Sequence, residues 1–145
     1  MTWVALQEKL SRFFQFSQTF QVYTDGSAKA GRGAWAYVIV KNGRVVSEAS
    51  GKATRTSCNR MEFQAAIEAL DSFSKKSRIE LFSDSRVLID ALNLKARRTV
   101  YGSDQLAILD DFTSTHAITW CWIRAHSGNP HNERCDRLCA AARGN

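Results

Sequence analysis

The spacing of hydrophobic residues predicts strands and helices in a definite order. Runs rich in aromatic and β-branched residues predict strands over 20–24, 34–40, 44–50, 79–83 and 117–123. Apolar residues that recur at intervals of three and four predict helices over 59–73, 85–94, 104–112 and 132–142. Asn42-Gly43 is a hairpin signal, and Ser57 is a candidate cap of the first of these helices. We expect the first strand to end at Asp25, before a small-residue loop through Gly33.

The order of these elements predicts the fold class. Three strands are followed by a helix, a strand, two helices, a strand and a last helix, which is typical of an α/β domain with a mixed sheet and crossover helices. This scheme accounts for residues 20–145. Residues 1–19 lie outside it and are expected to form an N-terminal extension.

The composition is that of one ordinary globular domain. The 145 residues are 44% hydrophobic and 23% charged, so the chain can bury a core without disulfides or a structural metal. Twenty Lys and Arg against fourteen Asp and Glu give a net charge of +6, which favours a polyanionic partner. Charge alone leaves nucleic acid, an anionic membrane surface and simple solubility open.

Membrane-spanning and secreted proteins are excluded by the sequence pattern. No stretch approaches the roughly 18 apolar residues of a membrane span, and Glu8, Lys9 and Arg12 stand where a signal peptide needs an apolar core. We therefore expect an intracellular protein with no membrane partner. Its four cysteines are expected to be reduced, three of them as small buried hydrophobes, rather than disulfide partners or zinc ligands.

Four carboxylates are candidates for chemistry. Glu62 begins a helical row whose other members are all apolar, so it is expected to face protein. Asp25 and Asp84 each follow a strand and would face one another if those strands lie side by side. Either one alone would also fit a turn or helix-cap aspartate. Asp136 borders the apolar stripe of the last helix. His126, in the loop before that helix, is either a surface imidazole or a proton carrier.

Carboxylates gathered at one site repel one another unless cations neutralise them. Hard oxygen ligands indicate Mg²⁺ or Mn²⁺. Two such ions about 3.5 to 4 Å apart can activate a water and stabilise the leaving oxygen at a phosphodiester. In a basic chain, this arrangement favours a nuclease. Glycoside hydrolysis, the other common use of paired carboxylates, explains neither the charge nor the four acids.

Five short motifs follow one another along the chain: Tyr23-Thr24-Asp25-Gly26-Ser27, Asn59-Arg60-Met61-Glu62, Ser83-Asp84-Ser85, Trp122-Ile123-Arg124-Ala125-His126-Ser127-Gly128 and Asn132-Glu133-Arg134-Cys135-Asp136-Arg137-Leu138. In this order and spacing they resemble the type 1 ribonuclease H family over about residues 20–143. The resemblance implies a ribonuclease H-like fold, with a five-stranded mixed sheet of order 3-2-1-4-5 and helices on both faces. It also implies cleavage of the RNA strand of an RNA–DNA hybrid, leaving 5′-phosphate and 3′-hydroxyl ends. We expect the enzyme to act as a monomer.

The resemblance also implies roles for the candidate residues. Asp25 would bind both of two Mg²⁺ ions, for which Mn²⁺ would substitute. Asp136 would complete the site that activates water, while Glu62 and Asp84 would hold the second ion at the leaving 3′ oxygen. His126 matches a histidine of the family that assists proton transfer or product release.

Substrate contacts follow from the same resemblance. Asn59 and the segment after Asp25 would lie along the 2′-hydroxyl groups of the RNA strand, the groups that distinguish RNA from DNA. Arg55 and Ser57 fall where the family binds a phosphate of the DNA strand. The full set of expected substrate-binding residues is Gly26, Ser27, Arg55, Ser57, Asn59, Ser85, Arg86 and Asn132.

The sequence departs from the family pattern at expected substrate contacts. The segment from residue 26 to 33 is short, Cys58 stands where asparagine is usual, and Arg86 where glutamine is usual. The stretch between residues 94 and 104 is also short, although it carries basic residues at Lys95, Arg97 and Arg98. We predict weaker or more salt-sensitive substrate binding than in relatives with a longer basic handle.

The N-terminal extension has a pattern of its own. The pattern Q-x-x-L-x-x-F-F, typical of peptides that dock on ring-shaped sliding clamps, is matched by Gln7, Leu10, Phe13 and Phe14. In a short helical turn the leucine and the two phenylalanines can plug one apolar pocket. The alternative is an amphipathic helix that packs on the domain itself through Trp3, Leu6, Leu10 and Phe13.

Two other classes of function compete with a ribonuclease. A catalytically silent hybrid-binding module would have no reason to keep four clustered carboxylates. A related nuclease acting on DNA would lack the combination of Asn-Arg-Met-Glu and His-Ser-Gly that this chain carries.

Overall fold

The structure is a computed structural model that describes residues 1–17, 19–93 and 102–144, with side chains for residues 1–10, 19–93 and 102–144. The strands are β1 Thr19–Lys29, β2 Arg32–Lys41, β3 Arg44–Thr54, β4 Arg78–Ser83 and β5 Ala117–Trp122. The helices are α1 Trp3–Ser17, α2 Cys58–Asp71, α3 Arg86–Asn93, α4 Ser103–Thr115 and α5 Pro130–Arg143. All nine predicted strands and helices are therefore present, together with α1.

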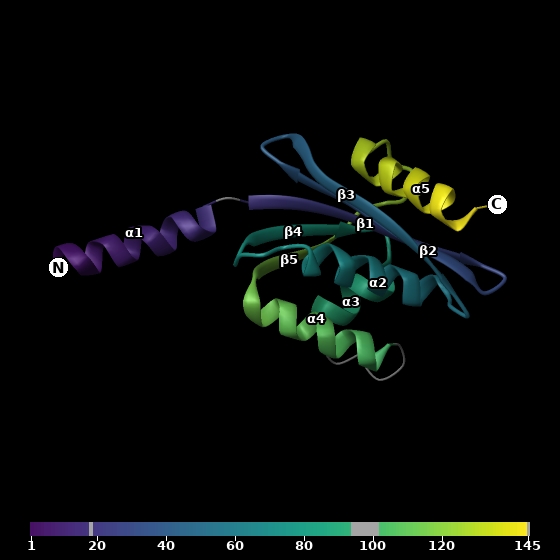
Figure 1. The fold of residues 1–145 in the computed structure, drawn as a ribbon, viewed down its shortest axis with the longest axis horizontal. Helices are drawn as coiled ribbons and strands as arrows, with labels where there is room; N and C mark the ends of the chain where they lie inside the picture. The colour runs from purple at the N-terminus through teal and green to yellow at the C-terminus, as the bar shows by residue number, and fades with distance from the viewer. Residues whose placement is uncertain (18, 94–101, 145) are drawn as a thin grey trace.

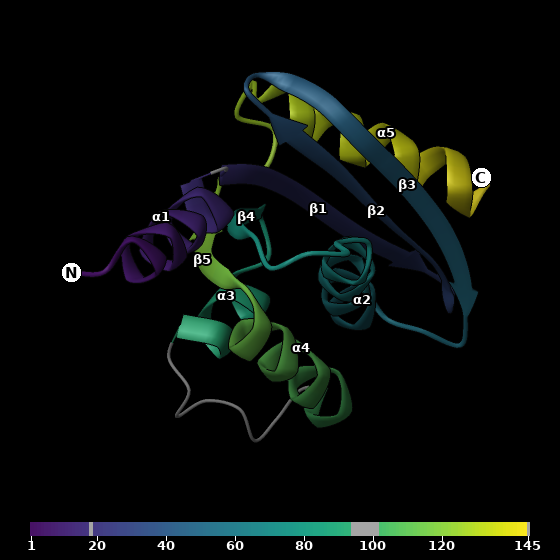
Figure 2. The ribbon, with the colours of Figure 1, turned by 60° about the vertical axis from the view of Figure 1, so that its left-hand side comes forward.

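The five strands form one mixed sheet in the order β3-β2-β1-β4-β5. β1, β2 and β3 are antiparallel neighbours, whereas β4 runs parallel to β1 and β5 parallel to β4. Figures 1 and 2 show α5 on one face of the sheet, and α2, α3 and α4 on the other. The predicted fold class and strand order are confirmed.

Each face of the sheet has its own hydrophobic core. On the face of α2, α3 and α4, the core includes Val22, Phe63, Leu70 and Leu81. On the face of α5, small strand residues such as Ala34 and Ala36 pack against Cys135 and Cys139. Burial raises the pKa of both thiols, as expected for cysteines that serve as small core residues. The prediction of three buried cysteines is wrong, because Cys121 is half-buried and Cys58 is exposed.

Side-chain caps determine where α2 and α5 begin. The Ser57 hydroxyl accepts a hydrogen bond from the Arg60 amide at 3.3 Å, which confirms Ser57 as the cap of α2. Asn129 caps α5 by accepting from the amides of residues 131 and 132, and Pro130 fits the first turn because its missing N–H needs no partner there. These caps set the positions along each helix at which acidic side chains leave it.

The prediction that the first strand ends at Asp25 is wrong. β1 continues to Lys29, and Asp25 pairs with Ala36 of β2. The turn lies instead at Ala30 and Gly31, with φ of 52° and 75°. Two consecutive residues at positive φ match the twist of a tight antiparallel hairpin, so the small residues before them remain in the ladder. The expected loop over residues 25–33 is thus mostly strand.

α1 extends away from the rest of the domain (Figure 1). Trp3 and Val4 are 72% and 64% exposed, and Leu6 and Leu10 are also exposed. The apolar positions of α1 over residues 3–10 are therefore not covered by the sheet or its helices. Among the helices of the described residues, none is both long and apolar enough to cross a lipid bilayer.

Candidate active site

Asp25 lies in the central strand of the sheet and is only 7% exposed. The next residue, Gly26, donates its amide to the Oδ1 atom of Asp25 and to the Oε1 atom of Glu62, at 3.0 Å each. One backbone N–H therefore ties together two carboxylates that are 37 positions apart. A Cβ on Gly26 would overlap the backbone of Met61, so only glycine lets α2 approach β1 this closely.

Glu62 lies one turn into α2 and is also 7% exposed. Its Oε2 atom accepts a hydrogen bond from the Ser83 hydroxyl at 3.2 Å, at the end of β4. The prediction that Glu62 faces protein is confirmed. Because two donors hold its two oxygens, the carboxylate is fixed between β1 and β4.

Asp84 follows directly after β4, which pairs in parallel with β1 through Tyr23 and Phe82. This pairing brings Asp84 beside Asp25, as expected if the two strands were neighbours. Carboxylate oxygens of Asp25, Glu62 and Asp84 lie within 4.8 Å of one another. We call these three residues the carboxylate cluster.

Burial and mutual repulsion raise the pKa values of the carboxylate cluster. The pKa of Asp25 rises to about 7, first because of burial and then because of the negative charge of Asp84. Burial and the charges of Asp25 and Asp84 raise the pKa of Glu62 well above its usual range. Burial also raises the pKa of Asp84, partly opposed by His126. A group of acids that holds protons this strongly is stabilised by a cation that replaces them.

Asp136 lies on α5 at the rim of the carboxylate cluster. It is exposed and is not one of the three residues whose oxygens lie within 4.8 Å. Its negative charge nevertheless raises the pKa of both Asp25 and Asp84, so it acts on the same site. The thiol of Cys139 donates to the Asp25 carbonyl at 3.4 Å, which holds α5 against the strand that carries the site.

His126 lies in the exposed loop between β5 and α5, where its φ of 54° is in the left-handed region. Its charge lowers the pKa of Asp84, so the imidazole lies on the same side of the molecule as the carboxylate cluster. The structure thus brings four acids and one histidine together around the carboxyl end of β4, from β1, α2, the residue after β4, α5 and a loop.

A family model for RNase H matches residues 17–143 of this chain. The chain belongs to the ribonuclease H family. It is 36% identical over 134 residues to a ribonuclease H of Francisella philomiragia, covering 83% of this chain and 88% of that protein. It is 37% identical over 136 residues to a ribonuclease H of Chlorobium phaeovibrioides, covering 83% and 92%. These relatives confirm the resemblance to ribonuclease H and the prediction of an enzyme.

Solved ribonuclease H structures share the fold. RNase H1 of Halobacterium salinarum superposes with a TM-score of 0.75 at 23% identity, covering 86% of this chain and 96% of that one. LC11-RNase H1, solved in complex with an RNA/DNA hybrid, superposes with a TM-score of 0.71 at 19% identity and the same coverage. The mixed sheet and its flanking helices are thus the ribonuclease H fold.

The ligand atoms of the carboxylate cluster are of the kind that a divalent ion prefers in this ribonuclease H. All three side chains offer oxygen, the ligand atom that Mg²⁺ and Mn²⁺ prefer. Neither of the buried cysteines is available, because their thiols donate to the carbonyls of Tyr23 and Asp25. Asp25, Glu62 and Asp84 are therefore the residues that would hold a metal, with Asp136 at the rim.

Five of the eight expected substrate residues fall into two groups in this ribonuclease H. Gly26, Ser57 and Ser85 make hydrogen bonds within the protein. The Gly26 amide donates to two carboxylates, and the Ser57 hydroxyl caps α2. The Ser85 hydroxyl accepts a hydrogen bond from the Leu88 amide. Arg55 is exposed and Asn59 is half-buried. Arg55, Ser57 and Asn59 lie at or just before the first turn of α2, and Ser85 follows Asp84 after β4.

Three further substrate candidates have distinctive surroundings. Ser27 accepts a hydrogen bond from Arg143 at 3.1 Å, and Asn132 is buried with its Oδ1 atom unpartnered among the described residues. Arg86 lies over the ring of Trp122, 3.9 Å from its centroid. Cys58, the unusual neighbour of Asn59, donates its thiol to the Ala28 carbonyl at 3.4 Å. The basic residues Lys95, Arg97 and Arg98 lie outside the described residues.

Sequence reasoning missed Trp122. Its Nε1–H donates to the Asp84 carbonyl at 3.1 Å, while its ring carries the guanidinium of Arg86. Trp122 therefore holds the backbone of one cluster residue and the side chain of a substrate candidate. The predicted strand over 117–123 places Trp122 near its end, and this was the only local signal; the pairing of Trp122 with Ser83, next to Asp84, is seen only in the structure.

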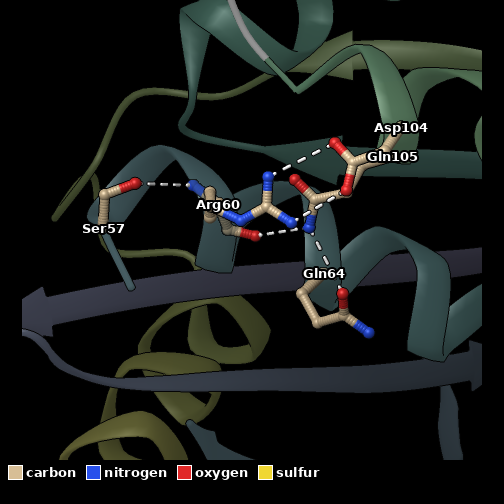
Figure 3. Close-up of polar contacts among 5 residues, drawn as sticks. All are labelled: Ser57, Arg60, Gln64, Asp104 and Gln105. Carbon is tan, nitrogen blue, oxygen red and sulfur yellow. Dashed lines mark hydrogen bonds and ion pairs between the residues drawn. The ribbon is translucent and has the colours of Figure 1, made fainter. Parts of the chain in front are cut away.

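Sequence reasoning also missed the contacts that hold α2 against α4 (Figure 3). Arg60 makes two hydrogen bonds to Asp104, at 3.3 and 3.0 Å. Gln105 donates to the Arg60 carbonyl and to the Gln64 side chain, at 3.0 and 3.2 Å. Arg60 and Gln64 stand two residues to either side of Glu62, so this network fixes the turn of α2 that carries it.

Proposed function

We propose that this ribonuclease H hydrolyses the RNA strand of RNA–DNA hybrids with the help of two divalent metal ions, leaving 5′-phosphate and 3′-hydroxyl ends. The observation that carries the proposal is the carboxylate cluster, with oxygens of Asp25, Glu62 and Asp84 within 4.8 Å of one another. The name of the curated relatives and the hybrid bound to LC11-RNase H1 support the substrate.

We assign each acid the role that the resemblance to the family implies. Asp25 would help to hold both ions, Asp136 would help to hold the first, and Glu62 and Asp84 the second. When bound, Mg²⁺ or Mn²⁺ lowers the pKa of a coordinated water and stabilises negative charge on the leaving oxygen. Since the pKa of Asp25 is about 7 without an ion, binding a cation displaces a proton from the cluster near neutral pH.

His126 is suited to moving a proton at the edge of the site. It is exposed on a loop, and its charge already reaches Asp84. We infer that it delivers or removes a proton as the 3′ oxygen leaves or the product departs.

Selection of the RNA strand is assigned to residues beside the carboxylate cluster. As the resemblance implies, Asn59, Gly26 and Ser27 would follow the 2′-hydroxyl groups. Arg55 and Ser57 would bind a phosphate of the DNA strand, and the neighbours Ser85, Arg86 and Asn132 would contact the substrate around the scissile bond. All the proposed catalytic groups come from one chain, so the proposed chemistry needs no second copy, and we propose a monomer. We propose that the enzyme acts inside the cell, because RNA–DNA hybrids form where genomes are copied and transcribed.

The test compares wild type with Asp25→Asn on labelled RNA–DNA hybrid, double-stranded RNA and double-stranded DNA in the presence of Mg²⁺. We expect wild type to cut only the RNA of the hybrid, and the variant to lose most of this activity. Equal cleavage by the two proteins would refute the mechanism. Binding of the hybrid without cleavage by wild type would support the silent binding module, and cleavage of DNA would support the related DNA nuclease.

We also propose that α1 docks on a DNA sliding clamp through Gln7, Leu10, Phe13 and Phe14. The exposed Leu6 and Leu10 support docking over packing on the domain. The side chains of Phe13 and Phe14 lie outside the described residues. In a pull-down with a clamp, we expect wild type to be retained and Phe13→Ala/Phe14→Ala to be lost. Equal retention of both proteins would contradict docking through this motif.

A further inference from the structure

Four basic side chains surround two adjoining hollows at the far end of β1. One hollow of about 480 Å³ is lined by Arg32, Gly33, Lys52, Ala53, Thr54 and Arg143. The second, of about 580 Å³, shares Arg32 and Arg143 and adds Lys29. We call the surface formed by Lys29, Arg32, Lys52 and Arg143 the basic groove.

Strand register explains why these residues share one face. Lys29 pairs with Arg32 across β1 and β2, and Lys52 pairs with Ala34 across β2 and β3. Directly opposed residues of antiparallel strands, and alternate residues along a strand, point to the same face. Ala34 packs against the buried cysteines of α5, so this is the α5 face. Arg143, the last residue of α5, completes the groove where the helix ends.

The positive charge of the basic groove is not neutralised within the described residues. Lys29, Arg32 and Lys52 are exposed and make no ion pair in that part of the chain, while Arg143 donates only to the Ser27 hydroxyl. Glu48, the one acidic residue of β3, is already paired with Arg134 at 2.7 Å. An anion brought into the groove would therefore meet four cations that have no ion-pair partner among the described residues.

The basic groove lies within reach of a polyanion held at the carboxylate cluster. Lys29 follows Asp25 by four residues on the same strand and the same face, about 13 Å at the usual rise of a strand. Ser27, halfway between them, is the residue that anchors Arg143. Nucleic acid carries a phosphate about every 3.4 Å of helix axis per strand, so a duplex bound at the cluster reaches the groove within about four nucleotides.

We propose that the basic groove binds the phosphodiester backbone of the nucleic-acid substrate beyond the cleavage site. This inference rests on the proposed function, because it takes the hybrid as substrate. The four cations come from β1, β2, β3 and the end of α5, and they are spread over an open surface. Such a surface suits an extended polyanion. A site for one small anion would instead gather donors around a closed pocket. The groove adds phosphate contacts that are independent of base sequence.

The test removes the charge of two groove residues and measures the salt dependence of binding. Fluorescence anisotropy follows a labelled hybrid of about 18 base pairs, without divalent ions so that it is not cleaved, from about 50 to 300 mM KCl. For Arg32→Gln/Lys52→Gln we expect binding roughly tenfold or more weaker at 100 mM. The slope of log K against log salt should become shallower by about 1 to 2.

Two controls isolate the position of the charge. Lys75→Gln/Lys76→Gln removes the same charge from exposed residues before β4, at the opposite end of β1, and should leave the slope unchanged. Arg32→Lys/Lys52→Arg keeps the charge and should keep wild-type affinity and slope. Equal melting temperatures of the variants show that each is folded.

The outcomes separate this inference from the proposed function. If wild type binds and cuts the hybrid but the groove variant keeps the wild-type slope, the groove inference is wrong and the proposed function stands. Loss of inorganic pyrophosphate binding in the variant, with an unchanged hybrid slope, would assign the groove to a small anion and refute the inference. If wild type neither binds nor cuts the hybrid, both proposals are wrong.

Discussion

Replacing Asp25 by asparagine should stabilise the metal-free protein, and by more at high pH than at low pH. The pKa of Asp25 rises from 3.8 to about 7 on folding, chiefly through burial. The folded state therefore holds a proton that the unfolded chain gives up between these two values. Stability falls as the pH rises from about 4 to about 7, because ionising a buried acid beside Asp84 and Glu62 is unfavourable.

The size of the effect follows from proton linkage. Between pH 4.5 and pH 8, Asp25 alone should cost the folded state about 3 kcal/mol, since each pKa unit is worth about 1.4 kcal/mol. Asparagine has the same shape and no charge to ionise. The variant should thus gain about 3 kcal/mol over wild type across this range, or roughly 10 °C in melting temperature at pH 8. Removing the charge of Asp25 also removes one cause of the raised pKa of Glu62. Ionising Glu62 then costs the folded state less, which stabilises the variant further at high pH.

The assay is urea denaturation of wild type and Asp25→Asn in EDTA, at intervals from pH 4.5 to pH 8. Asp71→Asn, on an exposed residue at the end of α2, is the matched control and should follow wild type at every pH. Added Mg²⁺ should stabilise wild type more than Asp25→Asn. A difference in unfolding free energy between wild type and Asp25→Asn that stays constant with pH would refute the reasoning.

Substitutions at three further positions test two contacts beside the site and one buried histidine at the opposite end of β4. Gly26→Ala should push α2 from β1, costing about 1 to 3 kcal/mol in urea denaturation and most of the hybrid cleavage. Trp122→Phe keeps a ring for Arg86 but loses the hydrogen bond to the Asp84 carbonyl, so we expect kcat to fall severalfold. Trp122→Leu also loses the ring under Arg86, so we expect it to raise KM as well. Burial lowers the pKa of His116, whose Nδ1 atom accepts a hydrogen bond from the Ser77 amide. The neutral imidazole therefore stabilises the folded state above about pH 6.5, and this stability is lost as the pH falls. In His116→Asn we expect this acid-dependent loss of stability to disappear.

Each of these expectations can fail separately. An unchanged melting curve and full activity in Gly26→Ala would show that α2 need not approach β1 so closely. Equal kinetic constants for the two Trp122 variants would mean that stacking on Arg86 is unimportant. If wild type and His116→Asn lose stability in parallel as the pH falls, the buried histidine is not the cause.

Periodicity predicted the nine strands and helices of the domain because their hydrophobic faces repeat at two or at three to four residues. It failed at the end of β1, where local preferences of Asp, Gly and Ser favour a turn. In the structure Gly26 stays in the strand because α2 passes against it, and the turn moves to Ala30 and Gly31. A contact between residues 26 and 61 carries no local signal, so the pattern of the segment alone could not reveal it.

The sequence by itself determined the order of the elements, the basic character of the chain and the four acids that stand out from their surroundings. Only the tertiary structure decided that three of them lie within 4.8 Å while Asp136 stays at the rim, and that Asp25 holds its proton to about pH 7. It also decided that Lys29, Arg32, Lys52 and Arg143 share one groove. The repulsion between the acids, the burial that raises their pKa values and the attraction of the groove for an anion all depend on distances between side chains. These side chains are up to 114 positions apart in the sequence, from Lys29 to Arg143, and come together only once the sheet has formed.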